Sequence, residues 1–219
     1  MTVEKSQESA LRVALYVDGF NLYVPIKKAG HNHLKWVSLW ALGEQLCGSE
    51  NWQLEKVLFC SALPKHRAES HKRHVTFNSA QIACGVKIIN GHYVPDDGDW
   101  SEKQTDINLA LSVILDGLDN VYDVAIILSA DSDQVATARA FKDKLAEKGK
   151  KLLAAIPPGQ TFPQGYQKYA VERLDVTWDM LERCMLPEKV KGLSGNIIER
   201  PASYAPHPLW IPISALKSS

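Results

Sequence analysis

Short apolar runs alternate with stretches of helical periodicity along most of the chain. Apolar runs typical of strands cover residues 11–17, 57–61, 86–89, 124–128 and 151–156, with a further short one at 171–176. Helical spacing covers residues 21–28, 36–47, 107–118, 135–148 and 178–185, and a basic stretch that ends near residue 85. Because the connections between strands are long enough for crossovers, the pattern predicts an α/β domain with a mostly parallel sheet and helices on both faces.

The segment around residues 107–118 carries further local signals. Thr105 is expected to cap this helix, with Asp106 in its first turn, where the helix dipole favours an ionised carboxylate. Residues 95–99 before it are expected to form a solvated turn. The helix should pack on the sheet through apolar residues at helical spacing, which are Ile107, Ala110, Leu111, Ile114 and Leu118.

The ends of the pattern predict how the chain is divided. Residues 1–10 are polar and are expected to form a flexible lead-in, followed by one domain over residues 11–186. Residues 187–219 hold five of the eleven prolines. They are expected to form an irregular extension that wraps the surface or reaches a partner.

Composition describes an ordinary globular protein, with 45% hydrophobic and 23% charged residues. The 25 basic and 25 acidic residues balance, so any binding to nucleic acid must come from a local patch. Cys47, Cys60, Cys84 and Cys184 are scattered without a Cys-x-x-Cys pair, which argues against a zinc site or a disulfide framework. No apolar run approaches about 18 residues, so a cytoplasmic protein without membrane contact is expected.

Carboxylates follow two of the predicted strands. Asp18 closes the first strand, and Asp131 and Asp133 follow the fourth. Open α/β sheets bind ligands at the carboxyl ends of their strands, where the strand order reverses. If these two strands are neighbours there, Asp18 and Asp131 end side by side and Asp106 approaches from the adjoining helix. Such carboxylates repel one another until a divalent cation joins them, and all-oxygen ligands favour Mg²⁺ or Mn²⁺ over zinc.

A cation held in this way supports hydrolysis of a phosphodiester by a metal-activated water, without a covalent intermediate. The alternative for any single acid is a helix cap or a lysine partner. For Asp18 and Asp131 together, both at strand ends, the metal site is the better interpretation. A phosphatase acting on small esters is less well supported, because the chain has no Asp-x-Asp after its first strand and no glycine-rich phosphate loop.

The densest cluster of basic residues follows the second predicted strand. It comprises Lys65, His66, Arg67, His71, Lys72, Arg73 and His74. These residues could form an ordinary solvated helix face. Phosphate contact is equally well supported, because the cluster follows a strand end on the expected ligand side of the sheet.

Three segments carry the acidic residues, in a characteristic order. They are residues 15–23 (LYVDGFNLY), 102–110 (EKQTDINLA) and 129–133 (SADSD). Together they resemble the NYN domain family of the PIN-like nuclease superfamily, especially its stand-alone bacterial members. The similarity also takes in Lys35, Trp36, Arg73, Phe77, Ala80, Arg200 and Pro201, so it covers nearly the whole chain. The chain departs from the usual pattern at Gln104, Thr105, Ala130 and Gln134, and none of these changes removes a carboxylate.

The resemblance implies a five-stranded Rossmann-like sheet and a Mg²⁺- or Mn²⁺-dependent endoribonuclease that acts on RNA. The implied metal ligands are Asp18, Asp106, Asp131 and Asp133, and the first three are also the implied catalytic acids. Asn21 would orient Asp18 or a water-linked phosphate, and Ser129 would support the loop after the fourth strand. The candidate phosphate contacts, besides Ser129, are Lys103, Arg73, Lys72 and Arg67.

An alternative is an RNA-binding or regulatory protein that keeps the acidic pocket with little or no turnover. The modest size of the basic cluster and the net charge of zero favour this alternative. The proline-bearing tail could also mediate a homodimer.

Overall fold

Seven strands form the central sheet of the computed structural model, which describes residues 9–48 and 51–216. In chain order they are β1 (Leu11–Asp18), β2 (Trp52–Ala62), β3 (Lys87–Asp96), β4 (Asp99–Lys103), β5 (Val124–Leu128), β6 (Lys151–Ile156) and β7 (Glu172–Asp175). Their order across the sheet is β4-β3-β2-β1-β5-β6-β7, and all neighbours are parallel except β3 and β4. The strand order therefore reverses between β1 and β5, which confirms the predicted neighbours.

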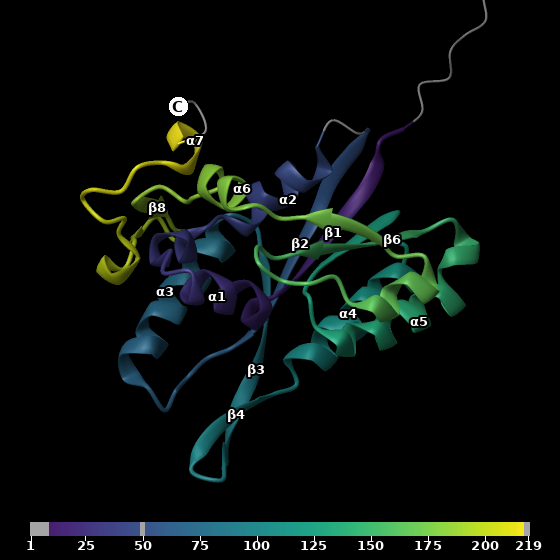
Figure 1. Ribbon diagram of the computed structural model, residues 1–219, viewed down its shortest axis with the longest axis horizontal. Coiled ribbons are helices and arrows are strands. Elements are labelled where there is room, and N and C mark those ends of the chain that lie inside the picture. Colours follow the sequence, from purple (N-terminus) through teal and green to yellow (C-terminus); the bar gives the residue numbers. More distant parts are fainter. Residues whose placement is uncertain (1–8, 49–50, 217–219) are drawn as a thin grey trace, which may run out of the picture.

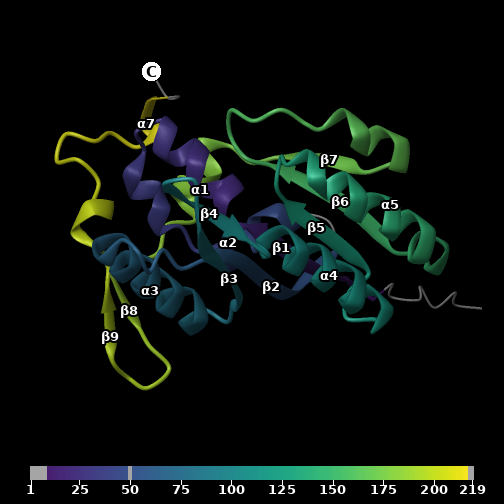
Figure 2. The same ribbon diagram turned by 90° about the horizontal axis from the view of Figure 1, so that it is seen from below.

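Helices cover both faces of the sheet (Figure 1). The α-helices of the described residues are α1 (Gly19–Lys28), α2 (Leu39–Cys47), α3 (Ala68–Ala83), α4 (Thr105–Leu118), α5 (Val135–Lys144), α6 (Trp178–Arg183) and α7 (Ile213–Leu216). Short 3-10 helices are η1 (Asn32–Trp36), η2 (Ser132–Gln134), η3 (Ala146–Lys148), η4 (Gln164–Tyr169) and η5 (Ala202–Tyr204). One face packs against α1, α2 and α6 and the other against α4 and α5, which lie side by side in Figure 2.

The alternation of side chains along β1 divides the core into two layers. Val13, Leu15 and Val17 point into the layer of α1 and α2, whereas Ala14 and Tyr16 point into the layer of α4 and α5. All five are inaccessible to solvent. A strand that is buried on both faces needs apolar residues at every position, which explains the continuous apolar run of this segment.

The family resemblance implied five strands, and this number was wrong: the sheet has seven, with one further strand at each edge. β7 extends one edge, and β4 folds back on β3 to form an antiparallel hairpin at the other. Asp97 and Gly98 both adopt positive φ, 42° and 86°, which makes the tight turn between the two strands. Figure 1 shows that the hairpin projects from the body of the molecule between α3 and α4.

The start and the orientation of α4 also differ from expectation. Gln104 precedes the helix with φ 75°, and the Thr105 hydroxyl donates to the Glu102 carboxylate instead of capping the helix. Leu109 and Val113 are buried against the sheet, whereas the predicted contact residues Ile107, Leu111 and Leu118 are exposed. Because apolar residues surround most of this helix, their spacing does not identify the stripe that faces the sheet.

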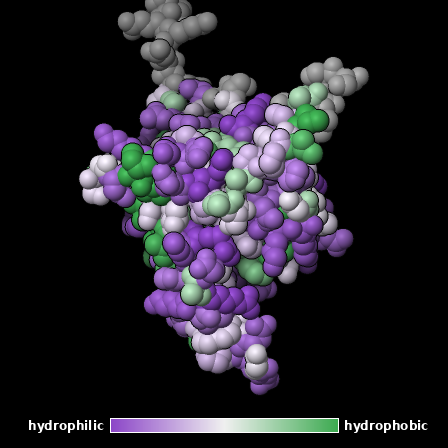
Figure 3. Space-filling model, turned by 90° about the vertical axis from the view of Figure 1, so that its left-hand side faces the viewer, coloured by the Kyte–Doolittle hydropathy of each residue, from purple (hydrophilic) through white to green (hydrophobic). Residues whose placement is uncertain are grey.

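The residues after α6 pack on α3, away from the sheet. β8 (Lys189–Lys191) and β9 (Ile197–Glu199) form an antiparallel hairpin. A small core forms here from Trp36, Ala80, Leu186, Val190, Ile198 and Tyr204. The Trp36 indole N–H also donates to the Pro187 carbonyl at 2.8 Å. Figure 3 views the molecule from this side, where hydrophilic side chains cover most of the surface.

Two expectations about the ends of the chain stay untested. Most of the expected flexible lead-in, residues 1–8, lies outside the described residues. The division at residue 186 into a domain and an extension stays a prediction. In residues 9–48 and 51–216, every helix is too short or too polar to cross a membrane.

Candidate active site

Three acids converge where the strand order reverses. Asp18 is the last residue of β1, Asp131 follows the end of the neighbouring β5, and Asp106 lies in the first turn of α4. One carboxylate oxygen from each of the three lies within 4.8 Å of the other two. The predicted convergence of Asp18, Asp106 and Asp131 is therefore present in the fold, because parallel pairing brings the carboxyl ends of β1 and β5 to one edge of the sheet.

A pocket of about 390 Å³ opens over this cluster. The start of α1 forms one wall, and the β3–β4 hairpin and the start of α4 form the rest. We call this space the acidic pocket. Its floor is formed by Asp18, Asp106 and Asp131, so a phosphate group entering it would meet three negative charges unless a cation is present.

The Asp18 side chain is almost fully buried, with 1% of its surface exposed, and its carboxylate accepts four hydrogen bonds. Its Oδ1 accepts from the backbone N–H groups of Phe20 and Asn21 at 3.0 and 3.1 Å, which caps α1. Its Oδ2 accepts from Asn21 Nδ2 at 2.7 Å and from Ser129 Oγ at 2.9 Å. Burial raises the pKa of Asp18, and these hydrogen bonds act in the opposite direction by stabilising the ionised form.

Asn21 and Ser129 join the two strand ends. Asn21 donates to Asp18 through its amide nitrogen and accepts from the Ala130 backbone N–H at 3.1 Å. Ser129 Oγ donates to Asp18 and accepts from the Asp131 backbone N–H at 3.1 Å. Both side chains thus fix the loop after β5 relative to the end of β1, so the separation of the carboxylates is set before any ligand binds.

Asp106 experiences the electrostatic cost of this arrangement most directly. Burial, followed by the charges of Asp18, Asp131 and Asp133, raises the pKa of Asp106 to about 6. A divalent cation between the carboxylates would remove this cost. Three converging carboxylates form an all-oxygen donor set of the kind that Mg²⁺ and Mn²⁺ prefer, so the residues present fit such an ion.

Asp133, the fourth predicted ligand, has a different position. The group of converging acids found among the described residues comprises Asp18, Asp106 and Asp131. Asp133 is exposed, and its backbone N–H donates to Asp131 Oδ1 at 2.9 Å. Its charge still contributes to the raised pKa of Asp106. A ligand role for Asp133 stays a prediction.

Ser129, one of the five predicted phosphate contacts, is buried beside Asp18, and the four basic ones are distributed over three places. Lys103 borders a groove between α4 and α5. Arg67 lines a pocket that adjoins the acidic pocket. Lys72 and Arg73 line a separate depression beside the C-terminal segment, with Glu199 and others. The basic cluster therefore divides between two surfaces, and the sequence order of its members did not indicate which of them lie near the acids.

Sequence reasoning missed the role of the β3–β4 hairpin as a wall of the pocket. Glu102, Tyr93 and Trp100 come from this hairpin and line the acidic pocket. Tyr93 lies opposite Glu102 in the β-ladder, and its hydroxyl donates to that carboxylate at 3.4 Å. Burial raises the pKa of Glu102, with Asp106 adding to the effect. These residues reach the site only because β4 folds back on β3. The signal for this hairpin in the sequence was the Asp97–Gly98 turn, with a tyrosine and a glutamate at matching distances on either side.

Gln134 marks another departure from the family pattern that the structure explains. Its side chain is 1% exposed, and the family resemblance implied an apolar residue at this position. Its Nε2 donates to the Asp106 carbonyl at 3.4 Å, and its Oε1 accepts from the Thr137 hydroxyl at 2.8 Å. The buried amide is therefore satisfied and links the loop after β5 to the start of α4.

A mostly parallel sheet with converging carboxylates at the reversal of strand order defines an α/β domain whose candidate site lies at the topological switch point. The chain matches the family model of the NYN domain over residues 12–168, and it belongs to this family. Membership indicates a nuclease. A search of curated proteins found no match. A similar fold occurs in the crystal structure of a protein of unknown function from Vibrio parahaemolyticus, with 16% identity, a TM-score of 0.54, and coverage of 78% of this chain and 96% of that chain.

Proposed function

We propose that the chain is a Mg²⁺- or Mn²⁺-dependent endoribonuclease that hydrolyses RNA phosphodiester bonds in the acidic pocket. The observation that carries this proposal is the convergence of Asp18, Asp106 and Asp131, whose carboxylate oxygens lie within 4.8 Å of one another. Family membership adds the expectation of a nuclease. Carboxylates alone would repel a phosphodiester, so a cation is needed for substrate to approach.

In the proposed reaction, the oxygen of a water forms a bond to phosphorus while the bond from phosphorus to the leaving ribose oxygen breaks. One proton of the water is released to solvent, and the leaving oxygen takes up a proton from solvent. Because the water attacks phosphorus directly, no covalent bond to the protein forms. A bound divalent ion would stabilise charge on a phosphoryl oxygen and lower the pKa of the attacking water. The chain supplies the geometry: Asp18 is oriented by Asn21 and Ser129, and Asp131 is held by the same loop.

The test compares Asp131→Asn with the wild type on a fluorescent RNA oligonucleotide in the presence of Mg²⁺ or Mn²⁺. The amide keeps the shape of the side chain but removes the charge, so cleavage should be lost while the fold remains. Asp143→Asn, an exposed acid on α5, is the matched control and should cleave at the wild-type rate. Undiminished cleavage by Asp131→Asn would overturn the assignment. Thermal unfolding of each variant checks that the fold is intact.

The second candidate function is RNA binding with little or no turnover. The chain has a net charge of zero, and Lys72 and Arg73 line a depression separate from the acids, so RNA bound to these two residues would not place a phosphodiester over the carboxylates. RNA binding that persists in chelator, with no cleavage in either metal, would establish this function instead.

A further inference from the structure

A second pocket continues from the acidic pocket. Its volume is about 500 Å³, and both pockets are lined by Phe20, Tyr93 and Trp100. Its other walls include basic residues from α1 and from the start of α3, namely Lys27, Lys28 and Arg67. We call this second pocket the basic groove. The two pockets adjoin at these shared aromatic residues, and we call them together the channel, which is acidic at one end and basic at the other.

The aromatic side chains at the junction are unusually accessible. Phe20 is 57% exposed and Trp100 is 41% exposed. Trp100 is nevertheless held in place, because His66 stacks on it with ring centroids 4.4 Å apart and planes only 3° from parallel. Tyr93 supports His66 edge-on at 5.0 Å. A large ring that is fixed from one side and open on the channel is a suitable surface for stacking a planar group.

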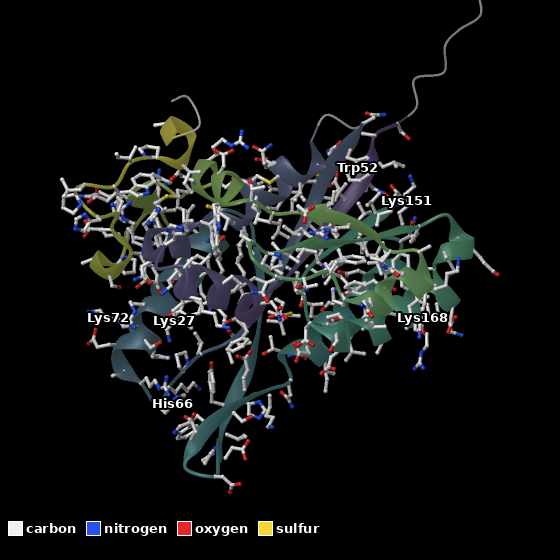
Figure 4. The ribbon with its side chains drawn as sticks, in the orientation of Figure 1. Lys27, Trp52, His66, Lys72, Lys151 and Lys168 are labelled. Carbon is white, nitrogen blue, oxygen red and sulfur yellow. The ribbon has the colours of Figure 1, made fainter. Side chains whose placement is uncertain are left out.

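The positive charges of the basic groove remain available to a ligand. Arg67 has an acidic neighbour in Asp99 at 3.6 Å, but both side chains are largely exposed, so this ion pair is weak. Lys27 and Lys28 lie in the last turn of α1, and both are exposed. Figure 4 shows that Lys27 and His66 lie on the side of the molecule from which the hairpin projects.

We propose that this channel binds single-stranded RNA next to the bond that is cut. Phosphates of the strand bind Lys27, Lys28 and Arg67, and unpaired bases stack on Trp100 and Phe20. In a duplex each base is already stacked and paired, so its face cannot reach these rings. The proposal rests on the proposed function for the position of the cut, which lies in the acidic pocket, and it adds that paired RNA is excluded.

Binding is measured without cleavage, with Asp131→Asn protein in chelator. Fluorescence anisotropy compares a labelled single-stranded RNA of mixed sequence with the same strand in a full duplex. We expect the single strand to bind at least about tenfold more tightly, and Trp100→Ala to remove about tenfold of that affinity. Trp100→Phe keeps a ring at the position and should retain most of the affinity. Equal affinity for the two RNAs, or no effect of Trp100→Ala, would overturn the proposal.

Salt dependence tests the binding of phosphates separately. Removing one lysine that binds a phosphate should lower the slope of log affinity against log salt concentration by about 0.7 for a single strand. Lys27→Ala and Lys28→Ala should each show this change. Lys151→Ala and Lys168→Ala are matched controls, because these lysines lie on the opposite side of the molecule (Figure 4), and their slopes should equal that of the wild type. Identical slopes for all four variants would contradict the assignment of Lys27 and Lys28 to the phosphates.

Stacking itself has a spectroscopic signature that a purely structural role of Trp100 would not produce. A single strand carrying 2-aminopurine should lose fluorescence on binding to the wild type and keep it on binding to Trp100→Ala. The outcomes also separate the two proposals. Single-strand binding that depends on Trp100, in a protein that never cleaves RNA, would support the channel and overturn the nuclease. Cleavage that is indifferent to Trp100 and to pairing would overturn the channel alone.

Discussion

Replacing Asn21 by alanine tests how the two strand ends are held together. The Asn21 side chain connects the buried carboxylate of Asp18 to the backbone of the loop that carries Asp131. We predict that Asn21→Ala destabilises the metal-free protein. We also predict that it lowers the cleavage activity measured with Mg²⁺ or Mn²⁺. The reason is that Asp18 loses one of its four donors and the loop after β5 loses its attachment to α1.

The expected size follows from two hydrogen bonds. Asn21 Nδ2 donates to Asp18 Oδ2 at 2.7 Å. A hydrogen bond to an ionised group contributes about 1.5–3 kcal/mol, and the neutral bond from the Ala130 N–H contributes about 1 kcal/mol. Alanine recovers roughly 0.5 kcal/mol of helix propensity within α1. The net loss in the free energy of unfolding should be about 2–3.5 kcal/mol, which corresponds to a fall in Tm of about 4–14 °C for a chain of this size.

The assay is urea unfolding followed by circular dichroism, first in chelator and then with excess Mn²⁺. Asn78→Ala in the middle of α3 is the matched control, because it makes the same substitution in a helix away from the site. Asn21→Asp is more informative still. This variant keeps the acceptor for the Ala130 N–H but puts a second carboxylate beside Asp18. In chelator, its free energy of unfolding should therefore fall further than that of Asn21→Ala, and Mn²⁺ should restore part of the lost stability. A loss for Asn21→Ala no greater than that for Asn78→Ala would refute this reasoning.

Two further predictions concern pH and the core. In chelator, the Asp106 carboxyl of the folded protein keeps its proton up to a pKa of about 6, whereas that of the unfolded chain releases it near the ordinary value of 3.8. The free energy of unfolding, followed as the urea midpoint, should therefore fall as pH rises from 3.8 to about 6. An unchanged midpoint over this interval would contradict the prediction. Tyr16→Phe should cost about 1–2 kcal/mol in urea unfolding, since the buried Tyr16 hydroxyl donates to Asp116 at 2.7 Å. Its loss leaves Lys56 as the remaining side-chain donor to that carboxylate among residues 9–48 and 51–216. A Tyr16→Phe variant as stable as the wild type would show that Asp116 needs only Lys56.

The central strands were predictable because they are buried on both faces. The structure confirms β5 at Val124–Leu128 and β6 at Lys151–Ile156 within the predicted limits. Such strands are apolar at every position, and turn residues bound them, so their length is visible in the sequence. Edge strands lack this signal: β4 is largely polar or exposed, and its last residues resemble the start of a helix in the sequence.

The acids of the site were predictable for a related reason. Asp18 and Asp131 interrupt apolar runs at their carboxyl ends, and in a parallel sheet such ends share one edge. The neighbours of these acids were harder to identify. A polar residue at position 134 was unexplained until the structure placed the Asp106 carbonyl within hydrogen-bonding distance of the Gln134 side chain. The order of residues in the chain also did not show that Lys72 and Arg73 line a different surface from Arg67.

From the sequence alone, the alternation of apolar runs and helical spacing determined the α/β class, the central strands, and the strand ends at which carboxylates would meet. Those features depend on residues close together in the chain, whose periodicity reflects burial directly. Only the tertiary structure decided which stripe of α4 faces the sheet, that β4 folds back on β3, and that Trp100 and Phe20 line the same pocket as the acids. These depend on the pairing of distant segments, and that pairing is selected by the packing of the whole molecule rather than by any local pattern.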